Sequence, residues 1–486
     1  MVRNTFMSIK PILYVIGLFL MLLGAVMITP AIYNLCTDSA GEAGFLEAAF
    51  ITFLSGALMS MTTRITMFRL DPRQIFLLTT LCWLMVSAFG ALPFMLVEKM
   101  NFTDAFFETM SGITTTGSTV ITNLHLVNKG ILLWRSLLQW LGGIGFIVMA
   151  VAILPFLKVG GMRLFQSESS DWSDKIMPRS GSIAKRIVGA YIVLTLFCTF
   201  GYWVGDMNLF ESINHAMTTV STGGYSTSDA SMGHFEGAWT YWNGTIFMLL
   251  GSMPFVLFVK CVRGNNLDLF KDSQVQTLVG SMVALWIVMA LWLTLTEGWE
   301  FFNALTLVAF NTTSVVSTTG FALTDYSTWS ILTTSIFFFL MFIGGCSGST
   351  AGGMKIFRFQ IGFKLLRLQI KQATHPRAFL VQTYNGQEIT NDILRSLVAF
   401  CFFYGLLIAL MTMMLSALGL DLMTCLTGSI TAVSNVGPGL GDIIGPAGNF
   451  IPLPETAKWI LSFGMLMGRL EILTVLVLLT PSFWRN

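Results

Sequence analysis

Long apolar runs without a charged residue divide the 486-residue chain, and they constrain its fold more than any other feature. Hydrophobic residues make up 54% of the chain and charged residues only 11%, whereas a soluble protein carries about 25% charged residues. About 20 apolar residues cross the hydrocarbon core of a bilayer as one helix. We therefore predict an all-α polytopic membrane protein with about ten transmembrane helices. The runs assigned to spans are 11–37, 48–63, 74–97, 136–157, 187–205, 237–259, 273–296, 326–354, 396–420 and 457–484.

The positions of the Lys and Arg residues orient these spans. Of the 27 basic residues, 22 lie at the termini or in alternate connecting segments, four lie in the remaining segments, and Arg469 lies within a span. Basic residues accumulate in cytoplasmic loops, so both termini are expected to be cytoplasmic. No Lys or Arg stands between Lys271 and Lys355, where two spans fit. A third span there would place the next basic loop outside, so the stretch between these two spans is predicted to be re-entrant from the outer side.

Stretches of this re-entrant type recur four times, at 104–124, 210–228, 301–324 and 421–441. Each reads as a short helix followed by a turn rich in Gly and hydroxyl residues. The turns are ITTTGS, VSTGGY, VSTTGF and VSNVGP, which align Gly117, Gly224, Gly320 and Gly437. Such internal repetition organises a fold, and it predicts four tandem helix–pore-loop–helix repeats around a pseudo-fourfold pore. Residues 1–73 would form two extra N-terminal transmembrane helices, and 74–186, 187–272, 273–392 and 393–486 would form pore repeats 1 to 4.

The composition of the four turns favours a cation filter. Non-helical backbone at membrane depth is tolerated only where protein buries it or water reaches it. Rings of backbone carbonyls replace the hydration shell of K⁺ in known filters, and Gly reaches positive φ without steric cost, which lets a carbonyl turn inward. Each preceding helix would direct its negative C-terminal end at the axis. The residues expected to bind K⁺ are Thr115, Thr116, Gly117, Thr222, Gly223, Gly224, Thr318, Thr319, Gly320, Asn435, Val436 and Gly437.

The short helices carry matching polar residues. Nine residues before each aligned Gly stand Glu108, His215, Asn311 and Gly428. Three of the four are polar, which indicates buried hydrogen bonds that hold the pore helices, and we expect this structural role for His215. Acidic residues in or beside the outer loops would concentrate cations at the mouth. They are Asp104, Glu108, Asp206, Glu211, Asp229, Glu236, Glu297, Glu300, Asp325, Asp421, Asp442 and Glu455.

Two further features are predicted to gate the pore. The run 326–354 is interrupted by GGCSGSTAGG at 344–353. Each Gly costs about 1 kcal/mol relative to Ala in a helix, so we expect an unwound loop below the filter. Arg469 lies in the last span, where a central Arg costs roughly 2.5–3.5 kcal/mol, and it would face the pore or a carboxylate. The predicted gating residues are Gly344, Gly345, Ser347, Gly348, Gly352, Gly353 and Arg469.

The chain resembles the Trk/Ktr/HKT superfamily of potassium transport subunits. The residues that carry the resemblance are TTTGS, STGGY, STTGF, SNVGPGLG, the loop GGCSGSTAGGMK and Arg469. The two extra N-terminal spans make the TrkH-type branch the most similar. The resemblance implies K⁺ uptake across the bacterial inner membrane, a filter mouth facing the periplasm, and a homodimer surrounded by lipid. It also implies a cytosolic TrkA-type regulatory ring that binds the nucleotide, ATP/ADP or NAD. This chain is expected to bind no cofactor and no nucleic acid. Its basic loops at 158–186 and 355–395 are the predicted docking surface for that ring.

The fourth turn departs from the pattern, because Ser434, Asn435 and Val436 replace its Thr-rich sequence. We therefore expect the symmetry of the ion site to fail there. Two alternatives stay open. An ion-coupled cation symporter, moving K⁺ with H⁺ or Na⁺, could use broken helices at the midplane. An intramembrane serine protease could use Gly345-Cys346-Ser347-Gly348, but that chemistry needs a His to take the Ser proton, and no His lies at span depth opposite Ser347.

Overall fold

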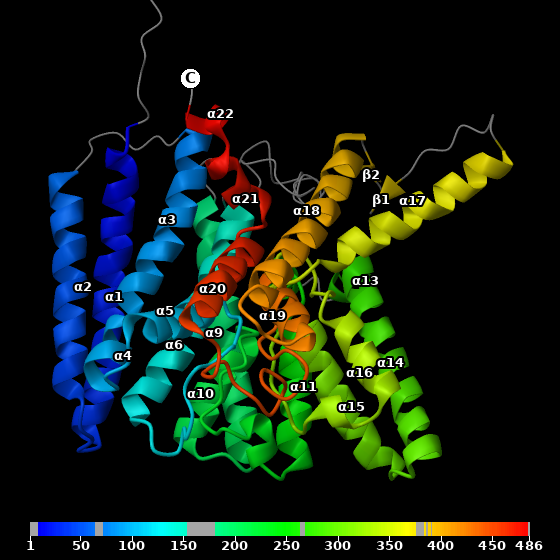
Figure 1. Ribbon diagram of the computed structural model, residues 1–486, viewed down its shortest axis with the longest axis horizontal. Helices are drawn as coiled ribbons and strands as arrows, with labels where there is room; N and C mark the ends of the chain where they lie inside the picture. The colour runs from blue at the N-terminus through cyan, green and yellow to red at the C-terminus, as the bar shows by residue number, and fades with distance from the viewer. Residues whose placement is uncertain are drawn as a thin grey trace, which may run out of the picture.

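The architecture is that of an all-helical membrane protein, seen in the computed structural model in Figure 1. The structure describes residues 8–63, 71–152, 180–262, 268–375, 383–384, 387–389 and 391–484. The predicted docking loop at 158–186 lies largely outside this part of the chain. The only strands in the described ranges form a two-residue hairpin of β1 (Thr383–Tyr384) and β2 (Gln387–Glu388).

The two N-terminal helices form a tightly packed antiparallel pair at one edge of the molecule (Figure 1). They are α1 (Lys10–Cys36) and α2 (Glu42–Thr62). A Cβ at Gly17 would lie 2.6 Å from the carbonyl oxygen of Gly56, and a Cβ at Gly56 would lie 2.5 Å from that of Gly17. Only Gly at both positions permits this approach, which is the usual way for membrane helices to gain contact.

The remaining helices repeat one order four times: a spanning helix, a short pore helix, and a helix that returns. The spanning helices are α3 (Pro72–Gly90) with its continuation α4 (Leu92–Val97), α9 (Ser180–Val204), α14 (Ser273–Glu297) and α18 (Asn391–Ser416). The pore helices are α5 (Phe102–Ile113), α10 (Leu209–Val220), α15 (Phe301–Val316) and α19 (Leu422–Ser434). The returning helices are α6 (Lys129–Ala152), α11 (Ala238–Gly251) with α12 (Phe255–Val262), α16 (Ile331–Leu340), and α20 (Glu455–Arg469) with α21 (Leu473–Leu476).

The other helical segments are short, apart from one. Helix α17 (Ile356–Thr374) follows the unwound loop after α16 and projects from the body of the molecule in Figure 1. The short segments are η2 (Ser231–His234), α13 (Asp268–Lys271), η3 (Tyr326–Thr328), η4 (Val477–Leu479) and α22 (Pro481–Trp484).

The returning helices differ most from the predicted straight spans. Among the described residues, seven helices are long and apolar enough to cross a membrane, or up to nine if two bent pairs each count as one span. The bent pairs are α11 with α12, at 97°, and α20 with the segment 473–479, at 107°. The predicted span 326–354 contains only the short helices η3 and α16, because its Gly-rich second half is not helical.

Three of the four spanning helices begin before the predicted repeat boundaries, whereas α14 begins at its boundary, residue 273. Helix α9 starts at Ser180, ahead of the predicted boundary at 187, because Lys185 and Arg186, which the charge pattern assigns to a loop, lie in its first turns. Helix α3 starts at Pro72 and α18 at Asn391, each just ahead of its boundary. The charge pattern therefore predicts the position of the membrane core more accurately than it predicts where each helix begins.

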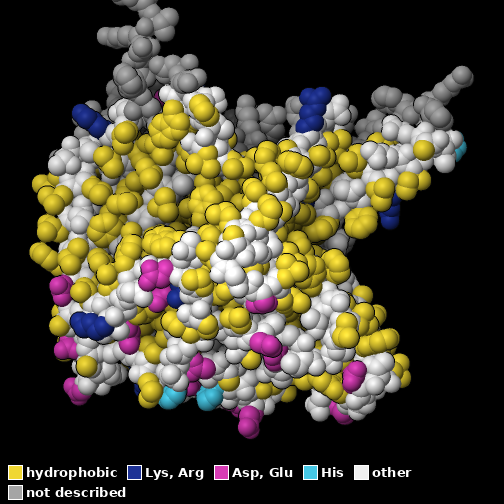
Figure 2. Space-filling view, in the orientation of Figure 1, with side chains coloured by type: hydrophobic (Ala, Val, Ile, Leu, Met, Phe, Trp, Pro, Cys, Tyr) yellow, Lys and Arg dark blue, Asp and Glu magenta, His cyan; other side chains and the backbone are white. Residues whose placement is uncertain are grey.

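All four pore helices begin with a side-chain cap. The caps are Asn101, Asn208, Glu300 and Asp421, whose side-chain oxygens accept backbone N–H groups of the first turn. Such caps satisfy N–H groups that have no partner within the helix. In Figure 2, Asp and Glu side chains gather in the lower half, which in Figure 1 is the end opposite the C-terminus, whereas hydrophobic side chains cover the flanks. This separation gives the molecule an acidic end.

Candidate functional site

The four turns share one unusual backbone conformation. Two residues before each aligned Gly, a residue with a side chain adopts positive φ: 54° at Thr115, 53° at Thr222, 57° at Thr318 and 56° at Asn435. The aligned glycines also have positive φ, with 87° at Gly117, 80° at Gly224, 82° at Gly320 and 113° at Gly437. A β-branched residue at positive φ is strained, and such strain persists only where the surroundings enforce it. The fourth turn keeps the same signs of φ despite its different sequence.

The aligned glycines connect the four turns into a closed ring. A Cβ at Gly117 would lie 2.2 Å from the carbonyl oxygen of Gly223, and one at Gly224 would lie 1.8 Å from that of Thr319. A Cβ at Gly320 would lie 2.2 Å from the oxygen of Val436, and one at Gly437 would lie 2.8 Å from that of Thr116. Each aligned glycine therefore faces the carbonyl of the residue that precedes the aligned glycine of the next repeat. Repeat 1 contacts repeat 2, repeat 2 contacts repeat 3, repeat 3 contacts repeat 4, and repeat 4 contacts repeat 1.

This ring brings the predicted filter residues together at the ends of the pore helices. The pore helices α5, α10, α15 and α19 end directly before the turns, so their C-terminal carbonyls point toward the ring. Within the ring, Ser118 Oγ also donates to the carbonyl of Gly437 at 2.8 Å, and Asn435 Nδ2 donates to Thr116 Oγ1 at 3.0 Å. The first and fourth turns, which are the most distant from each other in sequence, are thus also joined by side-chain hydrogen bonds.

Pore-helix side chains bond to the segment where each turn leaves the ring, at the backbone in repeats 1, 3 and 4 and at a side chain in repeat 2. Glu108 Oε2 accepts from Val120 N at 2.9 Å, and Asn311 Oδ1 accepts from Leu323 N at 3.1 Å. His215 Nε2 lies 3.0 Å from Ser226 Oγ, which is the structural role predicted for it. In the fourth repeat, Thr427 Oγ1 accepts from Leu440 N at 3.0 Å. Since Gly428 has no side chain, its neighbour makes the equivalent bond.

A buried ion pair that the sequence did not indicate supports the first turn. Arg135 Nε donates to Glu108 Oε1 at 2.8 Å, and both side chains are at most 2% exposed. The guanidinium also donates to the carbonyl of Ser226 at 3.1 Å and lies 4.2 Å from the ring centre of Tyr225. Arg135 thus joins helix α6, the first pore helix and the second turn. The sequence places both residues in or beside outer loops and gives no sign of their pairing.

A second unpredicted residue, Gln139 on α6, contacts the second turn directly. Its Nε2 donates to the carbonyl of Gly223 at 2.6 Å, and its Oε1 accepts from Tyr225 N at 3.0 Å. The Gln139 side chain is fully buried. A Gln within an apolar span signals a buried polar contact, but its partner is far away in sequence.

The predicted unwound loop at 344–353 is present, and it lies against the ring. Gly352 N donates to Thr318 Oγ1 at 2.6 Å, so the loop is bonded to the third turn. Thr350 Oγ1 donates to the carbonyl of Val220, at the end of the second pore helix, at 3.1 Å. The carbonyl of Ser252, at the bend between α11 and α12, accepts from Cys346 N at 2.8 Å. The bend in repeat 2 therefore makes room for the loop and binds it.

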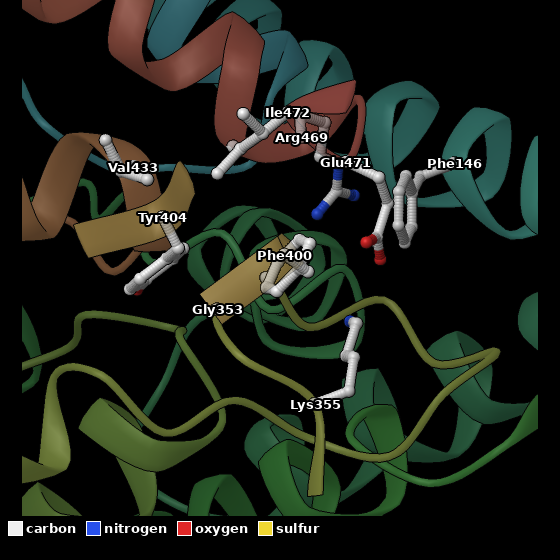
Figure 3. Close-up of a pocket in the computed structure, with 11 residues that line it drawn as sticks. Phe146, Gly353, Lys355, Phe400, Tyr404, Val433, Arg469, Glu471 and Ile472 are labelled. Carbon is white, nitrogen blue, oxygen red and sulfur yellow. The ribbon is translucent and has the colours of Figure 1, made fainter. Parts of the chain in front are cut away.

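Arg469 lies at the end of α20 and contacts this loop. Its Nη1 donates to the carbonyl of Thr350 at 2.8 Å, and its guanidinium lies 4.1 Å from the ring centre of Phe146. Phe146 also has Lys355 Nζ 5.4 Å from its ring centre. Arg469 is 1% exposed. Figure 3 shows these side chains around a cavity of about 10 Å³, which is close to the space that one water molecule needs.

Glu471 does not pair with Arg469. Its carboxylate is bonded to Arg358 of α17 in a buried ion pair, and Arg358 lies 3.6 Å from the ring centre of Phe400. The chain turns sharply after Arg469, with Glu471 at φ 59°, so the two side chains leave in different directions. Arg469 and Glu471 therefore face apart because of this turn, and not because of their spacing on a continuous helix.

Comparisons with known proteins agree with this geometry. A family model described as a TrkH cation transport protein matches residues 41–485. The chain belongs to the TrkH cation transport family. It is 49% identical to the Trk system potassium uptake protein TrkI of Halomonas elongata, over 100% of this chain and 99% of the relative. It is 34% identical to TrkH of Escherichia coli, over 99% of this chain and 100% of the relative.

The fold of a solved TrkH matches over nearly the whole length. The crystal structure of the potassium transporter TrkH from Vibrio parahaemolyticus has a TM-score of 0.92 at 33% identity, covering 99% of this chain and 100% of that chain. The predicted superfamily and the all-helical membrane fold are therefore confirmed. As a member of the TrkH family the chain is a transport protein and not an enzyme, so the protease alternative is wrong. Ser347 of its protease-like motif has its N–H bonded to Gln274 Oε1 at 3.0 Å, within the unwound loop.

Proposed function

We propose that this protein conducts K⁺ into a bacterial cell through the ring of four turns. The observation that carries the proposal is the closed ring, in which each filter glycine faces the carbonyl of the next repeat. A ring of backbone carbonyls offers the oxygen ligands that replace the hydration of K⁺. The relatives in Halomonas elongata and Escherichia coli are both Trk system potassium uptake proteins, which supports K⁺ as the conducted ion.

The proposed orientation places the acidic end outside the cell, at the filter mouth, and both termini in the cytoplasm. Carboxylates stand at the starts of the pore helices: Asp104, Glu211, Glu300 and Asp421. Carboxylates around a mouth raise the local concentration of cations. The same groups stabilise the positive ends of the pore helices, whose negative ends point at the ring. Entry and binding of a cation would therefore be favoured by one arrangement of charge.

We further propose that the loop 344–353 and Arg469 close the pore on the cytoplasmic side of the ring. The loop is hydrogen-bonded to the second and third repeats, and Arg469 is bonded to it from the fourth. A fixed positive charge in a cation path raises an electrostatic barrier. Opening would require both to move, and helix α17, which continues from the loop, is the element through which a cytoplasmic signal would act.

The regulatory and oligomeric parts of the proposal rest on the resemblance to the Trk/Ktr/HKT superfamily, and they are supported by relatives that belong to a Trk system. Two copies would form a homodimer in the membrane, in contact with lipid. A cytosolic TrkA-type ring would bind ATP/ADP or NAD and dock on the basic segments 158–186 and 355–395. Such segments also attract anionic lipid headgroups.

Rescue of a bacterial strain that lacks its potassium uptake systems tests the function. The wild-type chain, expressed with a Trk regulatory subunit, is expected to restore growth at low K⁺. Gly320→Ser is expected to fail, because its Cβ would lie 2.2 Å from the carbonyl oxygen of Val436. Rescue by the variant equal to that of the wild type would refute the filter assignment. Absence of rescue by the wild type, with both proteins present in the membrane, would refute K⁺ uptake.

A further inference from the structure

The second turn lacks a side chain that the other three turns have. Directly before the aligned glycine stand Thr116, Thr319 and Val436 in repeats 1, 3 and 4, but Gly223 in repeat 2. The φ of Gly223 lies outside the left-handed range, so its backbone would accept an L residue. The reason for glycine at this position must therefore lie in the space around it.

Gln139 occupies that space. A Cβ at Gly223 would lie 2.4 Å from Cδ, 2.5 Å from Oε1 and 2.8 Å from Nε2 of Gln139, and these are its three nearest atoms. Real Cβ atoms essentially never approach other atoms within 3.0 Å. The amide of Gln139, which reaches the ring from helix α6 of repeat 1, thus stands where the side chain of the second turn would begin.

The amide also fixes the polar groups on both sides of Gly224. It donates to the carbonyl of Gly223 at 2.6 Å and accepts from Tyr225 N at 3.0 Å. This assignment of amide oxygen and nitrogen is the one that satisfies both backbone groups. Two adjacent glycines have the greatest backbone freedom of any pair, and the two bonds remove that freedom where the ring needs a fixed carbonyl.

The hydrogen bond makes the Gly223 carbonyl different from its three counterparts. The carbonyls of Thr116, Thr319 and Val436 accept no hydrogen bond from any residue that the structure describes. A carbonyl oxygen that already accepts an amide N–H has one lone pair engaged and is held in direction. Of the four equivalent oxygens in the ring, one is therefore restrained by a side chain from outside the ring.

We propose that Gln139 is a positioning residue that sets the ion specificity of the filter, by standing in for the missing side chain of Gly223 and holding its carbonyl. This inference rests on the proposed conduction of K⁺ through the ring. A restrained carbonyl cannot move inward to a smaller ion, so the Gln139 bond favours K⁺ over Na⁺ at this layer. The asymmetry of the filter thus includes the second repeat as well as the fourth.

The first test compares Gln139→Met with the wild type in K⁺-depleted cells of an uptake-deficient strain, by initial rates of K⁺ uptake with and without Na⁺. Met retains the length of the side chain and removes both hydrogen bonds. We expect the KM for K⁺ to rise on the order of tenfold, the inhibition by Na⁺ to increase, and the maximal rate to stay near that of the wild type. Gln276→Met is the matched control, because Gln276 is exposed near the start of α14 and its side chain donates to the carbonyl of Phe270, away from the ring.

The second test uses reciprocal compensation. Gly223→Thr alone is expected to abolish uptake, since its side chain overlaps Gln139. Gly223→Thr combined with Gln139→Ala gives the second turn the VSTTG sequence of the third, up to the aligned glycine, and vacates the space. Uptake should therefore return to at least tenfold above that of Gly223→Thr. This comparison remains decisive if Gln139→Met does not fold.

The outcomes separate this inference from the proposed function. An unchanged KM and unchanged Na⁺ inhibition in Gln139→Met would overturn the positioning role. A double variant no more active than Gly223→Thr would overturn the spatial substitution. Failure of the wild type to take up K⁺ would instead refute the proposed function.

Discussion

Removing the charge of Glu108 is expected to destabilise the protein strongly, while leaving the shape of the site unchanged. In Glu108→Gln the amide oxygen can still accept from Val120 N, as the neutral Asn311 does from Leu323 N in repeat 3. What is lost is the counter-charge 2.8 Å from Arg135, whose side chain is 2% exposed. Leaving one partner of a buried ion pair unpaired costs about 3–5 kcal/mol. Solvent screening cannot offset that cost at this depth.

The loss can be measured by reversible unfolding in mixed micelles, with the denaturing fraction of SDS raised stepwise and helix content followed by circular dichroism. Asp104→Asn is the comparison, because Asp104 and Lys458 form another buried pair at 2.6 Å, with a carboxylate side chain that is 12% exposed and therefore better solvated. Glu108→Gln should lose more stability than Asp104→Asn. Combining it with Arg135→Met should recover part of the loss, because no charge is then left unpaired. Wild-type stability of Glu108→Gln, or a double variant less stable than the single one, would contradict the reasoning.

Three further outcomes test the filter and the gate. Gly320→Ala should abolish K⁺ uptake, whereas Gly419→Ala should not. The two glycines have nearly the same φ, 82° at Gly320 and 83° at Gly419, but no described residue beyond its chain neighbours lies within 4 Å of the Cβ position of Gly419. Equal activity of the two variants would count against the ring contact. Arg469→Ala should raise cation flux into liposomes at matched protein content, and unchanged flux would remove its role as a barrier. Thr318→Val should also raise the flux by releasing Gly352 N, while Thr318→Ser, which keeps the hydroxyl, should behave as the wild type.

The repeats were predictable because two independent patterns in the sequence agree. The distribution of basic residues limits the number of crossings between loops, and the aligned glycines mark places where only positive φ fits the chain. Both patterns can be recognised from the positions of residues in the sequence, without knowledge of any tertiary contact. The unwound loop was predictable for the same reason, since its glycines lie within ten consecutive positions. Each of these features depends on residues that are close in sequence or that repeat.

The contacts that complete the ring were not predictable in this way. Gln139 lies 84 residues from Gly223, and the residues around Gln139 in the sequence give no sign that its side chain bonds to a carbonyl of the ring. Arg135 directly precedes the predicted span 136–157, and its sequence position gives no sign that it is buried against Glu108. The sharp turns after Gly251 and Arg469 were likewise missed, because their flanking segments are apolar enough to read as single spans. Such features are set by tertiary packing between repeats.

The fourth turn keeps the backbone conformation of the other three turns although its sequence differs, and its Asn side chain makes contacts of its own. Asn adopts the left-handed region more readily than Thr, so Asn435 keeps the φ of Thr115, Thr222 and Thr318 with less strain. Its amide donates to Thr116 Oγ1 and to the carbonyl of Met465, each at 3.0 Å, which ties the first turn to helix α20.

The same turn also determines what can pack beneath it. A Cβ at Gly352 would lie 2.4 Å from the carbonyl oxygen of Ser434, and one at Gly468 would lie 2.0 Å from that of Val433. Gly352 belongs to the unwound loop, and Gly468 directly precedes Arg469. The last pore helix and its turn therefore contact both proposed gating elements through positions that admit only glycine. A shift of either element would act on the turn that holds Asn435, so we expect the fourth turn to be the place where the proposed filter and the proposed gate meet.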